Sequence, residues 1–143
     1  MATQVQVVID CADPSRLAAF WALALGYQVQ APPEGYASWE DALRAWDVPE
    51  DQWNSRGAVV DPDGVGPRLF FQQVPEGKVV KNRVHLDINA GVHVAEDDER
   101  RRVVDAVVAR LTEAGASTVR DMQERGEYWV VMQDPEGNEF CVQ

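Results

Sequence analysis

The alternation of apolar and polar positions predicts a strand just past the middle of the chain. In residues 82–89, Val84, Leu86 and Ile88 alternate with polar side chains, which is the period of a strand with one dry face and one polar face. The polar face carries His85, one of the two histidines, and the carboxylate of Asp87. We therefore expect this strand to form one wall of a functional site.

The same pattern predicts a strand, a helix and three further strands before residue 78. The first strand covers residues 4–12 and places Gln6 and Asp10 on its polar face. A helix over 14–25 follows the capping residue Asp13 and the proline after it, and Gly26 ends it. The remaining strands are expected at 27–31, 58–60 and 69–74.

The second half repeats this order. After the strand at 82–89, the pattern predicts a helix over 98–114 and strands at 117–122, 128–133 and 139–142. An Asp-Pro-acid-Gly turn begins at residue 61 and again at 134. This internal repeat predicts an α+β fold of two βαβββ modules, residues 1–78 and 79–143, in one domain. The two modules should form one curved, mostly antiparallel eight-stranded sheet around a cleft, with both helices on its outer face.

Residues 34–56 are the least regular part of the chain and hold three tryptophans, Trp39, Trp46 and Trp53. A short helix is expected from Trp39 to Trp46. Its aromatic face either covers the edge of the core or forms a cover over a ligand. The same tryptophans are candidate interface residues for a homodimer, since a curved open sheet has edges that need cover.

The charge balance excludes two classes of partner. Thirteen basic residues against twenty-four acidic ones give a formal net charge of −11, which would repel nucleic acid and anionic membranes. An acidic surface keeps a protein soluble, or attracts a cationic small molecule. The start of the chain lacks a signal-like segment, and no apolar run is long enough to span a bilayer. With only two cysteines, we expect a reduced cytoplasmic protein.

Several runs resemble the vicinal oxygen chelate superfamily, which contains glyoxalase I, extradiol dioxygenases and bleomycin-binding resistance proteins. The resemblance rests on residues 7–21, on Leu25-Gly26-Tyr27, on residues 82–87 and on the closing run 134–141. It is nearest to the small glyoxalase-like domain proteins of bacteria. It covers nearly the whole chain and implies the paired βαβββ fold described above. It does not assign a reaction, because this fold hosts isomerases, dioxygenases and pure binding proteins.

The resemblance also implies where a metal would bind. Gln6 matches the first ligand position of the metal-dependent members, and His85 matches the third. The second position falls on Phe71 or Gln72, depending on the register of the strand, and the fourth falls on Cys141 where the enzymes carry Glu. Both expected carboxylates are missing, so we expect no tightly bound catalytic metal. If a divalent metal binds, Gln6 and His85 are its expected ligands.

Strand alternation adds three acids to the same polar faces, namely Asp10, Asp87 and Glu139. They could act with His85 in acid–base chemistry, orient a small organic ligand, or remain hydrated at strand ends. The candidate ligand-binding set is therefore Gln6, Asp10, Phe71, Gln72, His85, Asp87, Glu139 and Cys141. Two functions stay open: a binding protein for a small organic molecule, or a metal-dependent glyoxalase, lyase or dioxygenase.

Overall fold

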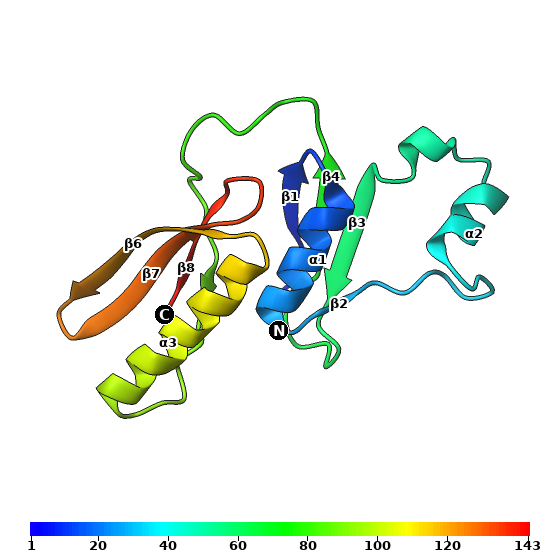
Figure 1. The fold of residues 1–143 in the computed structure, drawn as a ribbon. Coiled ribbons are helices and arrows are strands. Elements are labelled where there is room, and N and C mark those ends of the chain that lie inside the picture. The colour runs from blue at the N-terminus through cyan, green and yellow to red at the C-terminus, as the bar shows by residue number, and fades with distance from the viewer. The chain divides into compact units, whose positions relative to one another are not determined.

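The computed structural model describes all residues 1–143, which form two compact units, Met1–Gly77 and Lys78–Gln143. Each unit consists of a four-stranded sheet with a long helix packed on it (Figure 1). The fold class is α+β, and the internal repeat of two βαβββ modules is confirmed. That the two units form a single domain remains a prediction.

Unit 1 follows the predicted order with one insertion. Its sheet has the strand order β1-β4-β3-β2, in which β1 runs parallel to β4 and the other pairs are antiparallel. The insertion adds a short helix and a 3-10 turn between β2 and β3. The elements are β1 (Val7–Cys11), α1 (Pro14–Leu25), β2 (Gln28–Val29), α2 (Trp39–Ala45), η1 (Glu50–Gln52), β3 (Arg56–Val60) and β4 (Leu69–Gln73).

Unit 2 repeats the topology without the insertion. Its strand order is β5-β8-β7-β6, and again the first strand pairs in parallel with the last while the others are antiparallel. The elements are β5 (Asp87–Ile88), α3 (Asp97–Glu113), β6 (Ser117–Glu124), β7 (Glu127–Gln133) and β8 (Glu139–Val142). No helix of the protein is long and apolar enough to cross a membrane.

The two long helices begin and end within one residue of their predicted limits. The Asp13 carboxylate accepts the backbone N–H of Arg16 at the start of α1, and Gly26 ends this helix in the left-handed conformation at φ 69°. At the start of α3, the Glu96 carboxylate accepts the backbone N–H groups of Asp98 and Glu99. Acidic caps suit these positions because helix N-termini present unpaired N–H groups.

Each helix buries one face of its own sheet. In unit 1, Leu17 and Phe20 of α1 are buried, as are Leu69 and Phe71 of β4. Gly57 of β3 belongs to the same face, since a Cβ there would lie 3.3 Å from the Pro14 carbonyl oxygen and 3.6 Å from the Ala18 Cβ of α1. In unit 2 the buried residues are Val104 and Leu111 of α3 with Val130, Met132, Phe140 and Val142 of the sheet. The opposite face of each sheet carries the polar side chains.

The prediction of a strand over residues 82–89 is largely wrong, because only Asp87 and Ile88 are in strand conformation. Val84, expected on the dry face, is 82% exposed. The partner strand β8 begins only at Glu139, and the turn before it offers no extended backbone. The Asn82 N–H therefore pairs with the Glu139 carboxylate instead of a ladder carbonyl.

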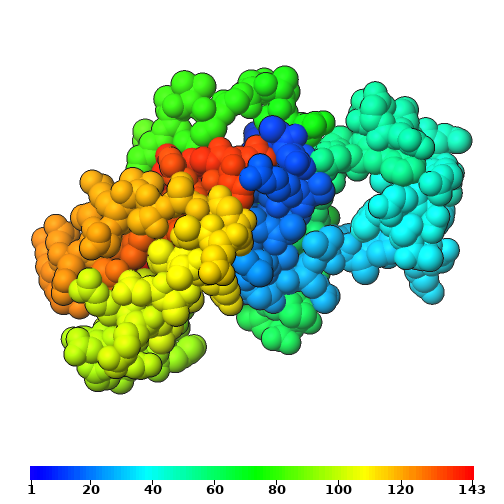
Figure 2. Space-filling view, viewed as in Figure 1, coloured from blue at the N-terminus to red at the C-terminus, as the bar shows by residue number.

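The short helix predicted at Trp39–Trp46 is confirmed as α2, and its segment projects away from the sheet of unit 1 (Figure 1) and stands out from the rest of the unit in the space-filling view (Figure 2). The aromatic residues pack locally. The Trp39 indole N–H donates to the Gln30 carbonyl oxygen and that of Trp53 to the Val48 carbonyl oxygen. Trp46 packs edge-on against Tyr36 and remains 49% exposed. These contacts agree with a structural role for the segment.

Candidate functional site

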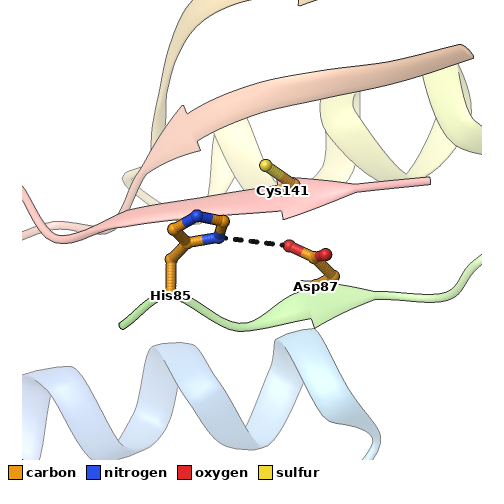
Figure 3. Close-up of side chains that lie close together, drawn as sticks. All are labelled: His85, Asp87 and Cys141. Atoms are coloured by element: carbon orange, nitrogen blue, oxygen red, sulfur yellow. Dashed lines mark hydrogen bonds and ion pairs between the residues drawn. The ribbon is translucent and has the colours of Figure 1, made fainter. Parts of the chain in front are cut away.

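Three potential ligand groups meet on the polar face of the unit 2 sheet, where β5 and β8 lie side by side (Figure 3). Asp87 is paired with Cys141 in the ladder. The Nδ1 atom of His85 lies 3.4 Å from Oδ1 of Asp87, and both side chains are about two-fifths exposed, at 40% and 43%. One donor atom from each of the three residues lies within 4.8 Å of the others. The structure thus brings together His85, Asp87 and Cys141, three of the residues that the sequence analysis singled out.

The Cys141 thiol is not activated by this arrangement. Burial raises the pKa of the Cys141 thiol, and the neighbouring carboxylate of Asp87 raises it further. A thiol must lose its proton to act as a nucleophile or a metal ligand. In the metal-free protein the group is therefore protonated at neutral pH and serves as a small, weakly polar part of the surface.

Glu139 lies on the same face of β8, but its carboxylate already has partners. It accepts the backbone N–H of Asn82 at 2.8 Å, and it forms an ion pair with Lys78 at 3.0 Å. Gln133 donates a third hydrogen bond at 3.4 Å. The Asn82 N–H is the largest cause that lowers the pKa of Glu139 to about 2, followed by Lys78. This carboxylate is consequently a poor proton acceptor, and Asp87 is the available acid beside His85.

The register of β4 decides between the two residues that the sequence left open. Phe71 is paired with Ile9 and Gly57 and is fully buried on the side of α1. The prediction of Phe71 as a ligand-facing residue is therefore wrong, because alternate residues of a strand point to opposite faces. Gln72 is exposed on the polar face and lies opposite Asp10 of β1.

Gln6, which we expect to be a ligand only if a metal binds, is engaged with a residue that the sequence analysis did not single out. Its Oε1 atom accepts a hydrogen bond from Nη1 of Arg68 at 2.5 Å. The Nε atom of Arg68 donates to Oε1 of Gln30 at 2.7 Å. Extension of the β4 alternation by two residues, from Gln72 through Phe70, would have placed Arg68 on the polar face. The signal was missed because Arg68 precedes the predicted strand.

The donor set of unit 2 is chemically suited to one class of metal. Imidazole, carboxylate and thiolate are all zinc ligands, with bond lengths of about 2.0–2.3 Å. His85, Asp87 and Cys141 offer one such group each, and metal binding would remove the thiol proton. A hard ion that prefers oxygen ligands, such as Mn(II), suits this set less well.

Repeated βαβββ units, each with polar residues on the sheet face opposite its helix, define a class of α+β fold. The family model described as "Glyoxalase-like domain" matches residues 6–143 of this chain. The chain therefore belongs to the glyoxalase-like domain family, within the vicinal oxygen chelate superfamily. The search of curated proteins gave no match.

Solved structures share the fold at low sequence identity. A glyoxalase/bleomycin resistance protein/dioxygenase family enzyme from Burkholderia phytofirmans PsJN is 18% identical, with a TM-score of 0.61 over 99% of this chain and 97% of that one. The fosfomycin resistance protein FosX from Listeria monocytogenes, as a variant complexed with Mn(II) and 1S,2S-dihydroxypropylphosphonic acid, is 10% identical, with a TM-score of 0.62 and coverages of 100% and 90%. TioX from Micromonospora sp. ML1 is 15% identical, with a TM-score of 0.54 and coverages of 99% and 97%.

Proposed function

We propose that this protein binds a small organic molecule on the polar faces of its sheets, without a tightly held catalytic metal. The observation that carries the proposal is the exposed pair of His85 and Asp87, separated by 3.4 Å on a sheet face that no helix of unit 2 covers. A donor–acceptor pair of this kind can orient a polar group of a ligand. Gln72 and Asp10 supply further exposed polar groups on unit 1.

The state of Glu139 favours binding over general-base catalysis. A general base works best with a pKa near the working pH, and the pKa of this carboxyl is lowered to about 2. The proposal therefore assigns Glu139 a supporting role, in which it holds the segment around Asn82 beside the site. A cytoplasmic location is part of the proposal, supported by the low cysteine content.

The FosX variant from Listeria monocytogenes is complexed with Mn(II) and 1S,2S-dihydroxypropylphosphonic acid. That ligand is said of FosX alone, since 10% identity supports only a shared fold. The FosX structure nevertheless supports the proposal, because it is an example of this fold with a small organic molecule bound.

The test is a thermal-shift screen of small metabolites and antibiotics, followed by calorimetry on the hits. We expect His85→Ala to weaken binding about two- to thirteenfold, the effect of losing one hydrogen bond of about 0.5–1.5 kcal/mol. The circular dichroism spectrum should stay unchanged, because His85 is exposed. His93→Ala is the matched control, since His93 is the second histidine and is also exposed. Equal weakening by both variants would contradict the proposal.

A second candidate is a metal-dependent enzyme of the glyoxalase, lyase or dioxygenase type. The observation in its favour is the meeting of His85, Asp87 and Cys141 donor atoms within 4.8 Å. A bound divalent ion there would act as a Lewis acid toward substrate oxygens. Elemental analysis of untagged protein separates the two candidates: stoichiometric metal that is lost in His85→Ala would favour the enzyme and overturn our proposal.

A further inference from the structure

Arg68 is held in a fixed position on the polar face of the unit 1 sheet. Its Nε atom donates to Gln30 at 2.7 Å and its Nη1 atom donates to Gln6 at 2.5 Å. Its guanidinium carbon lies 5.2 Å from the centre of the Phe70 ring. Two hydrogen bonds and a ring contact therefore orient this planar cation. Its partners come from the residue before β1, from β4 and from the residue after β2.

Both hydrogen-bond partners of Arg68 are neutral. Glutamine amide oxygens satisfy two N–H groups but supply no negative charge, and Arg68 has no ion pair with a carboxylate. A guanidinium carries five N–H groups, so both N–H groups of Nη2 and one of Nη1 remain for a partner. Such an edge matches the two oxygens of a carboxylate or a phosphonate.

The acids of the same sheet face do not neutralise this cation. Asp10 is the acid of β1 on that face, and it pairs in register with Gln72, whereas Arg68 precedes β4 at the opposite end of the strand. Four residues of strand span about 13 Å, which exceeds the screening length of about 8 Å at physiological salt. Arg68 is thus a cation whose hydrogen-bond partners are neutral, on a chain of net charge −11.

We infer that Arg68 is an oxyanion-binding residue, which receives the carboxylate or phosphonate group of an organic ligand at the Nη1–Nη2 edge of its guanidinium. Gln6 and Gln30 are positioning residues, because they fix the plane of this group before the ligand arrives and so reduce the entropy lost on binding. The Phe70 ring supports the cation. The inference rests on the proposed function, since the anion belongs to a small organic ligand, and it replaces the expectation of a cationic ligand.

The test uses benzoate, phenylphosphonate and the neutral analogue benzamide as probes of the full chain. In nitrogen-15 spectra of the unmodified protein, both anions should shift the Nε–Hε resonance of Arg68, while benzamide should leave it in place. In calorimetry, Arg68→Gln should bind both anions at least about tenfold more weakly than the unmodified protein, as expected for a lost charged hydrogen bond. Arg68→Lys should recover only part of the affinity, because lysine lacks the planar fork.

Arg56→Gln is the matched control. Arg56 is exposed, lies opposite Gln72 on the same sheet face, and its substitution changes the net charge equally. Equal loss of anion binding in Arg56→Gln would show a nonspecific charge effect and overturn the inference. The inference would also be overturned if none of the three probes shifted the Nε–Hε resonance of Arg68. If screened compounds then still bind in a His85-dependent manner, the proposed function stands; if nothing binds, both fail.

Discussion

Glu139 and Asp87 carry the same chemical group on one sheet face, but their surroundings differ. Glu139 is one-eighth exposed and accepts hydrogen bonds from Asn82, Lys78 and Gln133. Asp87 is 43% exposed and faces His85. The first carboxylate is therefore a structural anion of unit 2, whereas the second is available to a ligand.

Because the Glu139 carboxylate is hydrogen-bonded in the folded protein, its contribution to the free energy of unfolding should depend on pH. Its pKa falls from 4.5 to about 2 on folding, so its stabilising effect is fully present above about pH 4.5 and disappears as the pH falls toward 2. After a discount for solvent screening, Glu139→Gln should lower the free energy of unfolding by about 1–2 kcal/mol at pH 7. Denaturant titrations at pH 7 and pH 3 should show this difference shrinking with acidification.

Glu124→Gln is the control for this experiment, because Glu124 is an exposed carboxylate on β6. It should change stability by less than about 0.5 kcal/mol at either pH. An equal loss for Glu139→Gln at pH 7 and pH 3 would show that the carboxylate does not contribute through its charge.

The sequence predicted which residues share the polar faces but not which of them are already paired. Alternation alone placed Asp87 and Glu139 together. The partner Lys78 lies 61 positions before Glu139, in an irregular segment, and no local pattern links the two. The pairing of Arg68 with Gln6 has the same character, since the two residues are 62 positions apart.

At the scale of elements, the packing of α1 on β3 depends on one missing side chain. Gly57 allows the helix backbone to approach, because an added Cβ would meet the Pro14 carbonyl oxygen at 3.3 Å. We expect Gly57→Ala to destabilise the protein by about 1–3 kcal/mol, the usual cost of overpacking. Chemical denaturation measures this change. Gly77→Ala is the control, since nothing lies within 4 Å of its added Cβ, and similar effects of both variants would contradict the packing argument.

Helices were easier to predict than the strand before Asp87. The limits of α1 and α3 follow from caps that lie within a few residues of the helix. The extent of β5 depends on where its distant partner β8 begins, and this is not encoded in residues 82–86. Val84 therefore fits a strand pattern in the sequence but remains exposed in the structure.

At the scale of the whole molecule, we predict a homodimer. Trp46 stays 49% exposed although it is a large aromatic residue, as expected for interface material. Sedimentation equilibrium at micromolar concentration should give twice the chain mass of 15.9 kDa. Trp46→Ala should weaken the dimer, whereas Leu23→Ala, at another exposed apolar position, should not. A monomer at all concentrations would reject this prediction.

In both units the first strand hydrogen-bonds in parallel to the last, and this has a consequence for folding kinetics. Gln6 and Arg68, 62 positions apart, meet across one such closure, and Asn89 and Gln143, 54 positions apart, meet across the other. Contacts of high sequence separation form slowly because the intervening loop must lose entropy first. The strands that carry Asp10 and Asp87, with Gln6 just before the first of them, should therefore be the last to assemble. A partly folded chain with both helices formed would then lack both candidate ligand sites.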